Sequence, residues 1–317
     1  MKVALFYCAG FLAAALLGVP ALAQESLVPY DNFNAKRIDP AKWFGTEVGG
    51  GGYEAVREVR DHRLHLASRV YVNINRFRPS WTGRGRRLSL QNFDSLRLNA
   101  LTSSAVTAME ATVRVKKVEV TECSIPTVIV GADLTSVAQV WGTSLTSVTQ
   151  ARAGLFGFFF NTATPTPGSA VNDVLAGIAI VRQAPSTDTE KILRVQAFVL
   201  HCTDASCIGG TQLDLQDMGP IKRGKKARLR IQWDQANHRF IFQRDGEPEV
   251  FSPYTVSDTA PSGAQVKFLG ATNIVPNCRL QAGRPRPASF IDAFFDDVLV
   301  NESATDVFVD LSGANFP

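Results

Sequence analysis

Two runs of alternating residues decide the fold, Ala227-Arg228-Leu229-Arg230-Ile231-Gln232-Trp233 and His238-Arg239-Phe240-Ile241-Phe242-Gln243-Arg244. In the first run, apolar residues occupy every second position, and arginine and glutamine residues lie between them. A period of two indicates a strand with one buried face and one face in water. The polar stretch Asp234-Gln235-Ala236-Asn237 separates the runs, so together they predict a β-hairpin.

Similar patterns recur along most of the chain, for example at 69–75, 113–116, 175–181 and 192–200. The run 153–160 is nearly all apolar, which predicts a central strand that is buried on both faces or faces an apolar groove. Helical periodicity is scarce, and no repeat or linker divides the chain. We therefore predict an all-β fold, one antiparallel β-sandwich domain over residues 24–317.

The first 23 residues have the features of a signal peptide. Met1-Lys2 gives a positive start, the apolar run 3–19 follows, and Pro20-Ala21-Leu22-Ala23 ends in small residues. An uncleaved membrane anchor is the alternative, but Pro20 and the small-residue site favour cleavage after Ala23. No later apolar run approaches the roughly 20 residues of a membrane helix. The sequence thus predicts a periplasmic or secreted protein whose mature chain has no transmembrane span.

Charge and cysteine content narrow the classes of protein further. The formal net charge of the 317 residues is +4, which does not suggest a general nucleic-acid binder. Four cysteines follow the signal segment, an even number that suggests two disulfides in an exported chain. Of the three possible pairings, the short Cys202–Cys207 spacing favours a local bridge, which leaves Cys123 with Cys278.

Three segments resemble the concanavalin A-like lectin and glucanase superfamily. Tyr30-Asp31-Asn32-Phe33-Asn34 and Ile38-Asp39-Pro40-Ala41-Lys42-Trp43 are similar to its opening element. The hairpin at 228–233 and 239–246 is similar to its middle hairpin, and Ala293-Phe294-Phe295-Asp296-Asp297-Val298-Leu299-Val300 to its closing strand. The resemblance implies a jelly roll whose first and last strands are neighbours and whose concave face often holds carbohydrate. It also implies core positions for Trp43 and Trp233. Because the same fold serves laminarinase-type enzymes and pure binders, it does not imply an activity.

No catalytic residue can be assigned. A retaining glycosidase needs two carboxyl groups about 5–5.5 Å apart, which this superfamily supplies from an E-x-D-x-x-E strand. That pattern is absent from the sequence. Glu110 lies on a predicted strand without a second acid as partner. The sequence therefore favours a protein without catalytic activity, and a hydrolase or lyase with another kind of site is the alternative.

The candidate ligand-binding residues are loop aromatics and a group of arginines. Trp81 and Trp141 lie in polar segments where a sugar ring could stack on them. Around Trp81 cluster Arg76, Arg78, Arg84, Arg86 and Arg87, which could contact an anionic polysaccharide, lipid A phosphates or nucleic acid. A second basic run, 222–226, is interpreted as a solvated turn that protects a sheet edge.

Metal binding has weaker support in the sequence. Some members of the superfamily hold a structural calcium ion, and the matching acids here would be Asp296 with Asp31. On a strand, His62 and His65 would face opposite sides and could not share a metal, so we interpret them as surface or hairpin residues.

The leading hypothesis is an exported module that binds glycan without an evident catalytic site. A polysaccharide hydrolase or lyase is the first alternative. A structural cell-envelope protein with a protein partner that the sequence does not identify is the second.

Overall fold

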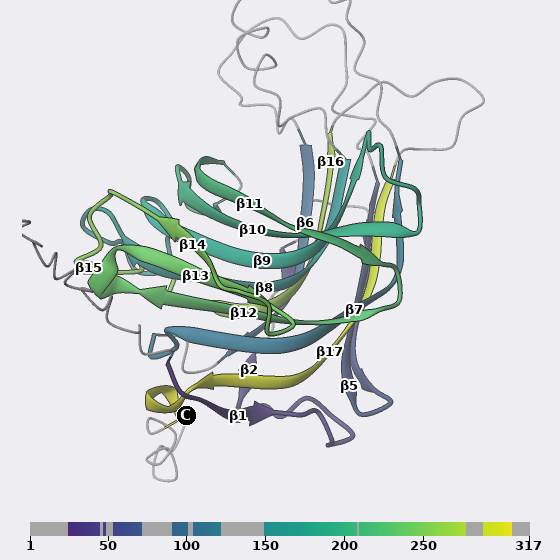
Figure 1. Ribbon diagram of the computed structural model, residues 1–317, viewed down its shortest axis with the longest axis horizontal. Helices are drawn as coiled ribbons and strands as arrows, with labels where there is room; N and C mark the ends of the chain where they lie inside the picture. The colour runs from purple at the N-terminus through teal and green to yellow at the C-terminus, as the bar shows by residue number, and fades with distance from the viewer. Residues whose placement is uncertain are drawn as a thin grey trace, which may run out of the picture.

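The computed structural model describes residues 25–44, 47–48, 53–71, 91–100, 104–121, 149–207, 209–276 and 288–305. Within these ranges the chain is nearly all strand, and the strands form two antiparallel sheets stacked as layers (Figure 1). This confirms the predicted antiparallel β-sandwich. No helix in the described ranges is long and apolar enough to cross a membrane. The predicted signal peptide 1–23 lies outside them.

The first layer is an eight-stranded sheet in the order β14-β13-β12-β7-β17-β5-β4, with β1 paired to β17. Its strands are β1 (Leu27–Asp31), β4 (Tyr53–Arg60), β5 (Arg63–Tyr71), β7 (Ala108–Val120), β12 (Lys226–Asp234), β13 (Arg239–Arg244), β14 (Val250–Pro253) and β17 (Ala288–Asn301).

The second layer is a nine-stranded sheet in the order β11-β10-β9-β8-β16-β6-β2, with β3 paired to β6 and β15 paired to β8. Its strands are β2 (Trp43–Phe44), β3 (Glu47–Val48), β6 (Gln91–Ala100), β8 (Thr149–Asn161), β9 (Asp173–Ala184), β10 (Ile192–Cys202), β11 (Gly210–Lys222), β15 (Ala260–Pro261) and β16 (Lys267–Pro276).

The hairpin predicted from the alternating runs is β12 and β13, joined by the short 3-10 turn Gln235–Asn237. Leu229 and Ile231 are fully buried on one face of β12, as the period of two requires. Trp233 packs against the core, stacked on Phe160 with ring centroids 5.4 Å apart. The core position expected for Trp233 is therefore confirmed.

The first and last strands are neighbours, which also agrees with the sequence-based expectation. Leu27 of β1 pairs with Asn301 of β17. Just after β1, Trp43 is 2% exposed, and its Nε1 donates a hydrogen bond of 2.6 Å to the Asp31 carboxylate. Trp43 thus occupies the core position expected for it.

Strand β8 divides its residues between two environments. Ala151, Ala153 and Leu155 are fully buried in the core between the sheets. Arg152 and Phe156 project from the other face of the same strand, where they line a groove. Every residue of the run 153–160 is buried, as predicted for a central strand buried on both faces, and Phe156 and Phe158 also line the groove, so the structure supports both alternatives.

Candidate binding groove

The groove runs over the outer face of the nine-stranded sheet and has a volume of about 240 Å³. Strands β6, β16, β8, β9, β10 and β11 all contribute to its lining. Residues paired directly across neighbouring strands have side chains on the same face, so the pairing register sorts the lining into rows that cross the strands. Three of these rows define the chemistry of the groove.

A row of very small residues lies beneath the polar side chains of the groove, and we call it the glycine row. Gly270, Gly154 and Ala179 are paired in succession across β16, β8 and β9, and the row continues to Arg97 on one side and to Gln196 and then Asp217 of β11 on the other. A Cβ added to Gly154 would overlap the Ile178 carbonyl oxygen and lie 2.6 Å from the Ala179 Cα. Only glycine fits there, because the backbones approach too closely for a side chain.

Aromatic side chains form the next row. Phe268 pairs with Phe156, and Phe156 and Phe198 are both paired with Gly177, which lies between them. Phe156 and Phe268 stack with ring centroids 5.2 Å apart. These rings belong to a second apolar cluster, on the opposite side of the sheet from the main core. All three rings are buried, with Phe156 2%, Phe268 3% and Phe198 9% exposed, so they form a packed apolar base for the polar lining of the groove.

Two arginines bring positive charge onto the glycine row. The Arg152 guanidinium reaches over the row, with its Cζ 4.8 Å from the Phe198 ring centroid and 5.5 Å from that of Phe156. The Arg97 Cζ lies 4.5 Å above the Phe268 ring. Both are cation–π contacts, which hold each guanidinium in place without neutralising its charge.

The surroundings of Arg152 are unfavourable for a cation. Desolvation, with a further contribution from the positive charge of Arg97, lowers the pKa of Arg152 from 12.5 to about 10. The side chain still carries its charge at neutral pH. Its Nε is buried and has no hydrogen-bond partner in the described part of the chain. The guanidinium therefore retains unused capacity to bind an anion.

Amide side chains complete the polar lining. Gln150 and Gln183 are paired on β8 and β9, Gln196 of β10 continues the glycine row, and Gln212 lies on β11. Each amide offers two donors and an acceptor, a combination suited to hydroxyl groups. The described lining contains no Asp or Glu. The nearby Asp217 is held by Arg194 in an ion pair outside the groove lining.

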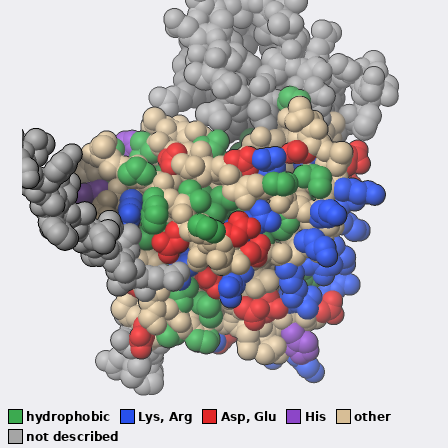
Figure 2. Space-filling view, in the orientation of Figure 1, with side chains coloured by type: hydrophobic (Ala, Val, Ile, Leu, Met, Phe, Trp, Pro, Cys, Tyr) green, Lys and Arg blue, Asp and Glu red, His purple; other side chains and the backbone are tan. Residues whose placement is uncertain are grey.

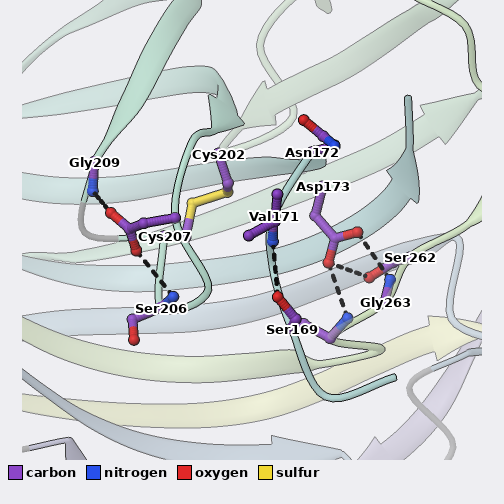
Figure 3. The surroundings of a disulfide bond; sticks show 12 residues. Ser169, Val171, Asn172, Asp173, Cys202, Ser206, Cys207, Gly209, Ser262 and Gly263 are labelled. Carbon is purple, nitrogen blue, oxygen red and sulfur yellow. Dashed lines mark hydrogen bonds between the residues drawn. A yellow bond between two sulfur atoms is a disulfide. The ribbon is translucent and has the colours of Figure 1, made fainter. Parts of the chain in front are cut away.

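One wall of the groove is fixed by the disulfide between Cys202 and Cys207, which confirms the local bridge predicted from their spacing (Figure 3). Beside it, the buried carboxylate of Asp173 accepts hydrogen bonds from the Ser262 hydroxyl at 3.0 Å and the Gly263 amide at 2.8 Å. Because Asn161 also donates to this carboxylate, at 2.7 Å, Asp173 ties the loop before β16 to β8 and β9. We interpret Asp173 as a structural carboxylate.

The structure does not describe the ligand-binding residues that were expected from the sequence. Trp81, Trp141, Arg76, Arg78, Arg84, Arg86 and Arg87 all lie outside the described residues, as do Cys123 and Cys278. Their proposed roles, and the second disulfide, stay predictions.

Glu110 lies 3.5 Å from Arg228 on the outer face of the eight-stranded sheet, remote from the groove, and this ion pair does not supply a second acid. One expectation about titratable residues needs correction. His65 is not a surface residue, because it is 7% exposed and lies between Glu58 at 3.0 Å and Asp292 at 3.1 Å. The hydrogen bond to Asp292 contributes most to raising the pKa of His65.

The two acids proposed to bind calcium have protein partners. Asp31 accepts hydrogen bonds from the Trp43 ring and the Phe33 amide, and Asp296 lies 3.4 Å from Arg63. Within the described ranges, no three His, Cys, Asp or Glu side chains come together in a way that could hold a metal ion. Calcium binding stays a prediction.

A sequence signal for the groove exists in Gln150-x-Arg152-x-Gly154-x-Phe156-x-Phe158. The alternate positions carry an amide, a cation, a glycine and two aromatic rings. Their chemistry resembles a ligand-binding face more than a core. The contribution of Arg97 from β6, which is distant in sequence, needed the register of the sheet.

No protein-family model and no curated protein matches the sequence. Solved structures do match in architecture. An alginate lyase, Aly36B, is 13% identical with a TM-score of 0.33, over 88% of this chain and 98% of that one. The β-glucanase of Bacillus licheniformis is 8% identical with a TM-score of 0.41, over 89% and 99%. The laminarinase from Flavobacterium sp. UMI-01 is 12% identical with a TM-score of 0.40, over 87% and 100%.

These likenesses concern the arrangement of strands. At such low identity they say nothing about a ligand.

Proposed function

We propose that this chain binds an anionic polysaccharide in the groove of the nine-stranded sheet. Arg152 and Arg97 would contact acidic groups of the polymer, such as uronate carboxylates. The glutamine side chains would contact its hydroxyls, and the buried Phe156 and Phe198 rings would hold the Arg152 guanidinium in place. The disulfide between Cys202 and Cys207 fits the predicted export of the protein.

The observation that carries the proposal is the environment of Arg152. A desolvated guanidinium without an acidic partner lowers the stability of the free protein, since burying an uncompensated charge is costly. A carboxylate or sulfate in the groove would compensate that charge. Because the described lining contains no acid, a neutral glucan would leave the Arg152 charge uncompensated.

We favour binding over hydrolysis because the described groove lining offers no carboxyl pair with which to cleave a glycosidic bond. A panel of alginate, polygalacturonate, hyaluronan and neutral laminarin separates the two functions. Calorimetry on this panel measures affinity, and release of reducing ends or unsaturated products measures catalysis. Binding to at least one acidic polymer but not to laminarin is the expected result.

Two variants sharpen this test. Arg152→Met removes the groove cation, and Arg228→Met removes an equal charge from the outer face of the eight-stranded sheet. Only Arg152→Met should greatly weaken binding to the acidic polymers. Equal affinity for laminarin and the acidic polymers, or no affinity for any of them, would contradict the proposal. The role predicted for Trp81 can be tested on the same panel with Trp81→Ala.

A further inference from the structure

The rows of the groove continue to the edge of the nine-stranded sheet. Gln150 of β8 pairs with Gln183 of β9, and Ile192 of β10 pairs with Lys222 at the end of β11. Arg194 of β10 pairs with Val181 of β9, and this register places Ile192 beside Gln183. The four residues therefore form one row on the same face of the sheet. A ligand that crosses the strands over the groove therefore meets Lys222 as it leaves the sheet.

Lys222 opens a turn whose cations point into solvent. The turn is fixed by backbone hydrogen bonds from the Arg223 amide to the Lys191 carbonyl at 2.8 Å and from the Lys225 amide to the Lys222 carbonyl at 3.0 Å. Gly224 occupies the left-handed region with φ of +83°. Lys191, Lys222, Arg223 and Lys225 are all exposed, and we call these four residues the basic edge.

The charge of the basic edge is largely uncompensated. Among the described residues, none of its four members forms an ion pair, whereas the acids nearest to the groove, Asp188 and Asp217, are both paired with Arg194. Glu190 is exposed next to Lys191 and offsets part of the charge. The turn between β11 and β12 lies at the right of Figure 1, where Figure 2 shows Lys and Arg side chains gathered.

We propose that the basic edge is a distal contact for the same anionic polysaccharide, which extends from the groove across β9, β10 and β11. This inference rests on the proposed function of the groove. From β6, which carries Arg97, to β11 there are five strand spacings, or about 24 Å at about 4.8 Å each. A trisaccharide is too short to reach both Arg97 and the basic edge, whereas a polymer can contact both. The affinity should therefore depend on chain length through the basic edge.

The test compares two charge-matched variants on short and long ligands. In the basic-edge variant, Lys191, Lys222, Arg223 and Lys225 are replaced by Gln. In the control variant, Gln replaces four exposed cations outside the basic run 222–226: Lys36, Arg37, Arg60 and Arg228. Alginate and polygalacturonate serve as probes, each as polymer and as trisaccharide, and calorimetry gives the dissociation constants near physiological ionic strength.

We expect the basic-edge variant to bind a polymer about 16-fold more weakly than the wild type, because four exposed contacts each contribute roughly a factor of two. Its affinity for the trisaccharide should be unchanged, and the control variant should stay within about twofold for both ligands. Equal weakening in the two variants would overturn the inference by showing a general charge effect. Wild-type affinity of the basic-edge variant for the polymer would also overturn it, while the groove proposal stands. A wild-type protein that binds neither polymer nor trisaccharide refutes the groove proposal itself.

Discussion

Replacing Arg152 by Met should make the protein more stable and weaken the binding of anions in its groove. Lowering the arginine pKa from 12.5 to about 10 corresponds to about 3 kcal/mol of unfavourable burial. The side chain is partly open to solvent in the groove, so screening reduces the gain to about 2 kcal/mol. Loss of the cation–π contacts with Phe156 and Phe198 offsets about 1 kcal/mol. Methionine keeps apolar contact with these rings.

The net expectation is a gain of about 1 kcal/mol in the free energy of unfolding, or a rise in Tm of about 2 °C for a domain of this size. Binding should change in the opposite direction. A charge-assisted contact in a desolvated site contributes about 2 kcal/mol, which corresponds to about a 30-fold loss of affinity. Thermal unfolding and calorimetry on the same preparation measure both quantities.

Arg228→Met is the matched control, because Arg228 is exposed and contacts Glu110 at 3.5 Å away from the groove. Its effect on stability should stay within about 0.5 kcal/mol, and its effect on affinity should be absent. If Arg152→Met lowered the Tm by several degrees, the arginine would be a structural residue and the reasoning from its desolvation would be wrong. Unchanged affinity for acidic polymers in that variant would equally refute its role in binding.

Three further predictions concern the supports of the groove. Burial lowers the pKa of Lys267 to about 7, so between pH 7 and pH 10.5 the unfolded chain holds more protons than the folded protein. The free energy of unfolding should therefore rise with pH over that window, by up to about 4–5 kcal/mol. Urea unfolding of Lys267→Met should lack this rise with pH. Reducing the disulfide between Cys202 and Cys207 should cost about 2 kcal/mol for so short a loop and weaken glycan binding, measured by Tm and calorimetry with and without dithiothreitol. Gly154→Ala should lower the free energy of unfolding by about 2–3 kcal/mol, because its Cβ would overlap backbone atoms. In Gly270→Ala the Cβ would meet the Phe268 ring at 3.1 Å, so the free energy of unfolding in the same urea titration should fall by less.

The strands and the fold class could be predicted because the alternation of residues that indicates a strand is local. Alternation in 227–233 and the polar turn after it determine the hairpin of β12 and β13, whatever the rest of the chain does. The pairing of β1 with β17 could be expected from a family resemblance of the two end segments, although no local pattern states it. Strand order and register depend on contacts between distant residues, and a single sequence contains no direct signal for them.

The groove could be predicted less well, since its residues become neighbours through the register of the sheet. Arg97 meets the glycine row because β6 pairs with β16, although the two strands are distant in sequence. From the sequence alone, tryptophans and closely spaced arginines are the stronger candidates, because a single sequence shows only clusters within a short segment. The buried position of His65 was missed for a related reason, because its partner Asp292 is supplied by a strand near the other end of the chain.

The alternation of β8 has a consequence for testing function in this protein. Ala151, Ala153 and Leu155 serve the core between the sheets, while Gln150, Arg152 and Phe156 serve the groove. Because the two sets lie on opposite faces of one strand, polar or charged groove residues can be replaced without opening the core. Gly154 is the exception, since it faces the groove but also sets the approach of β8 to β9. Loss of binding in Arg152→Met therefore reports on the ligand site, whereas loss of binding in Gly154→Ala would report on the sheet that supports the site.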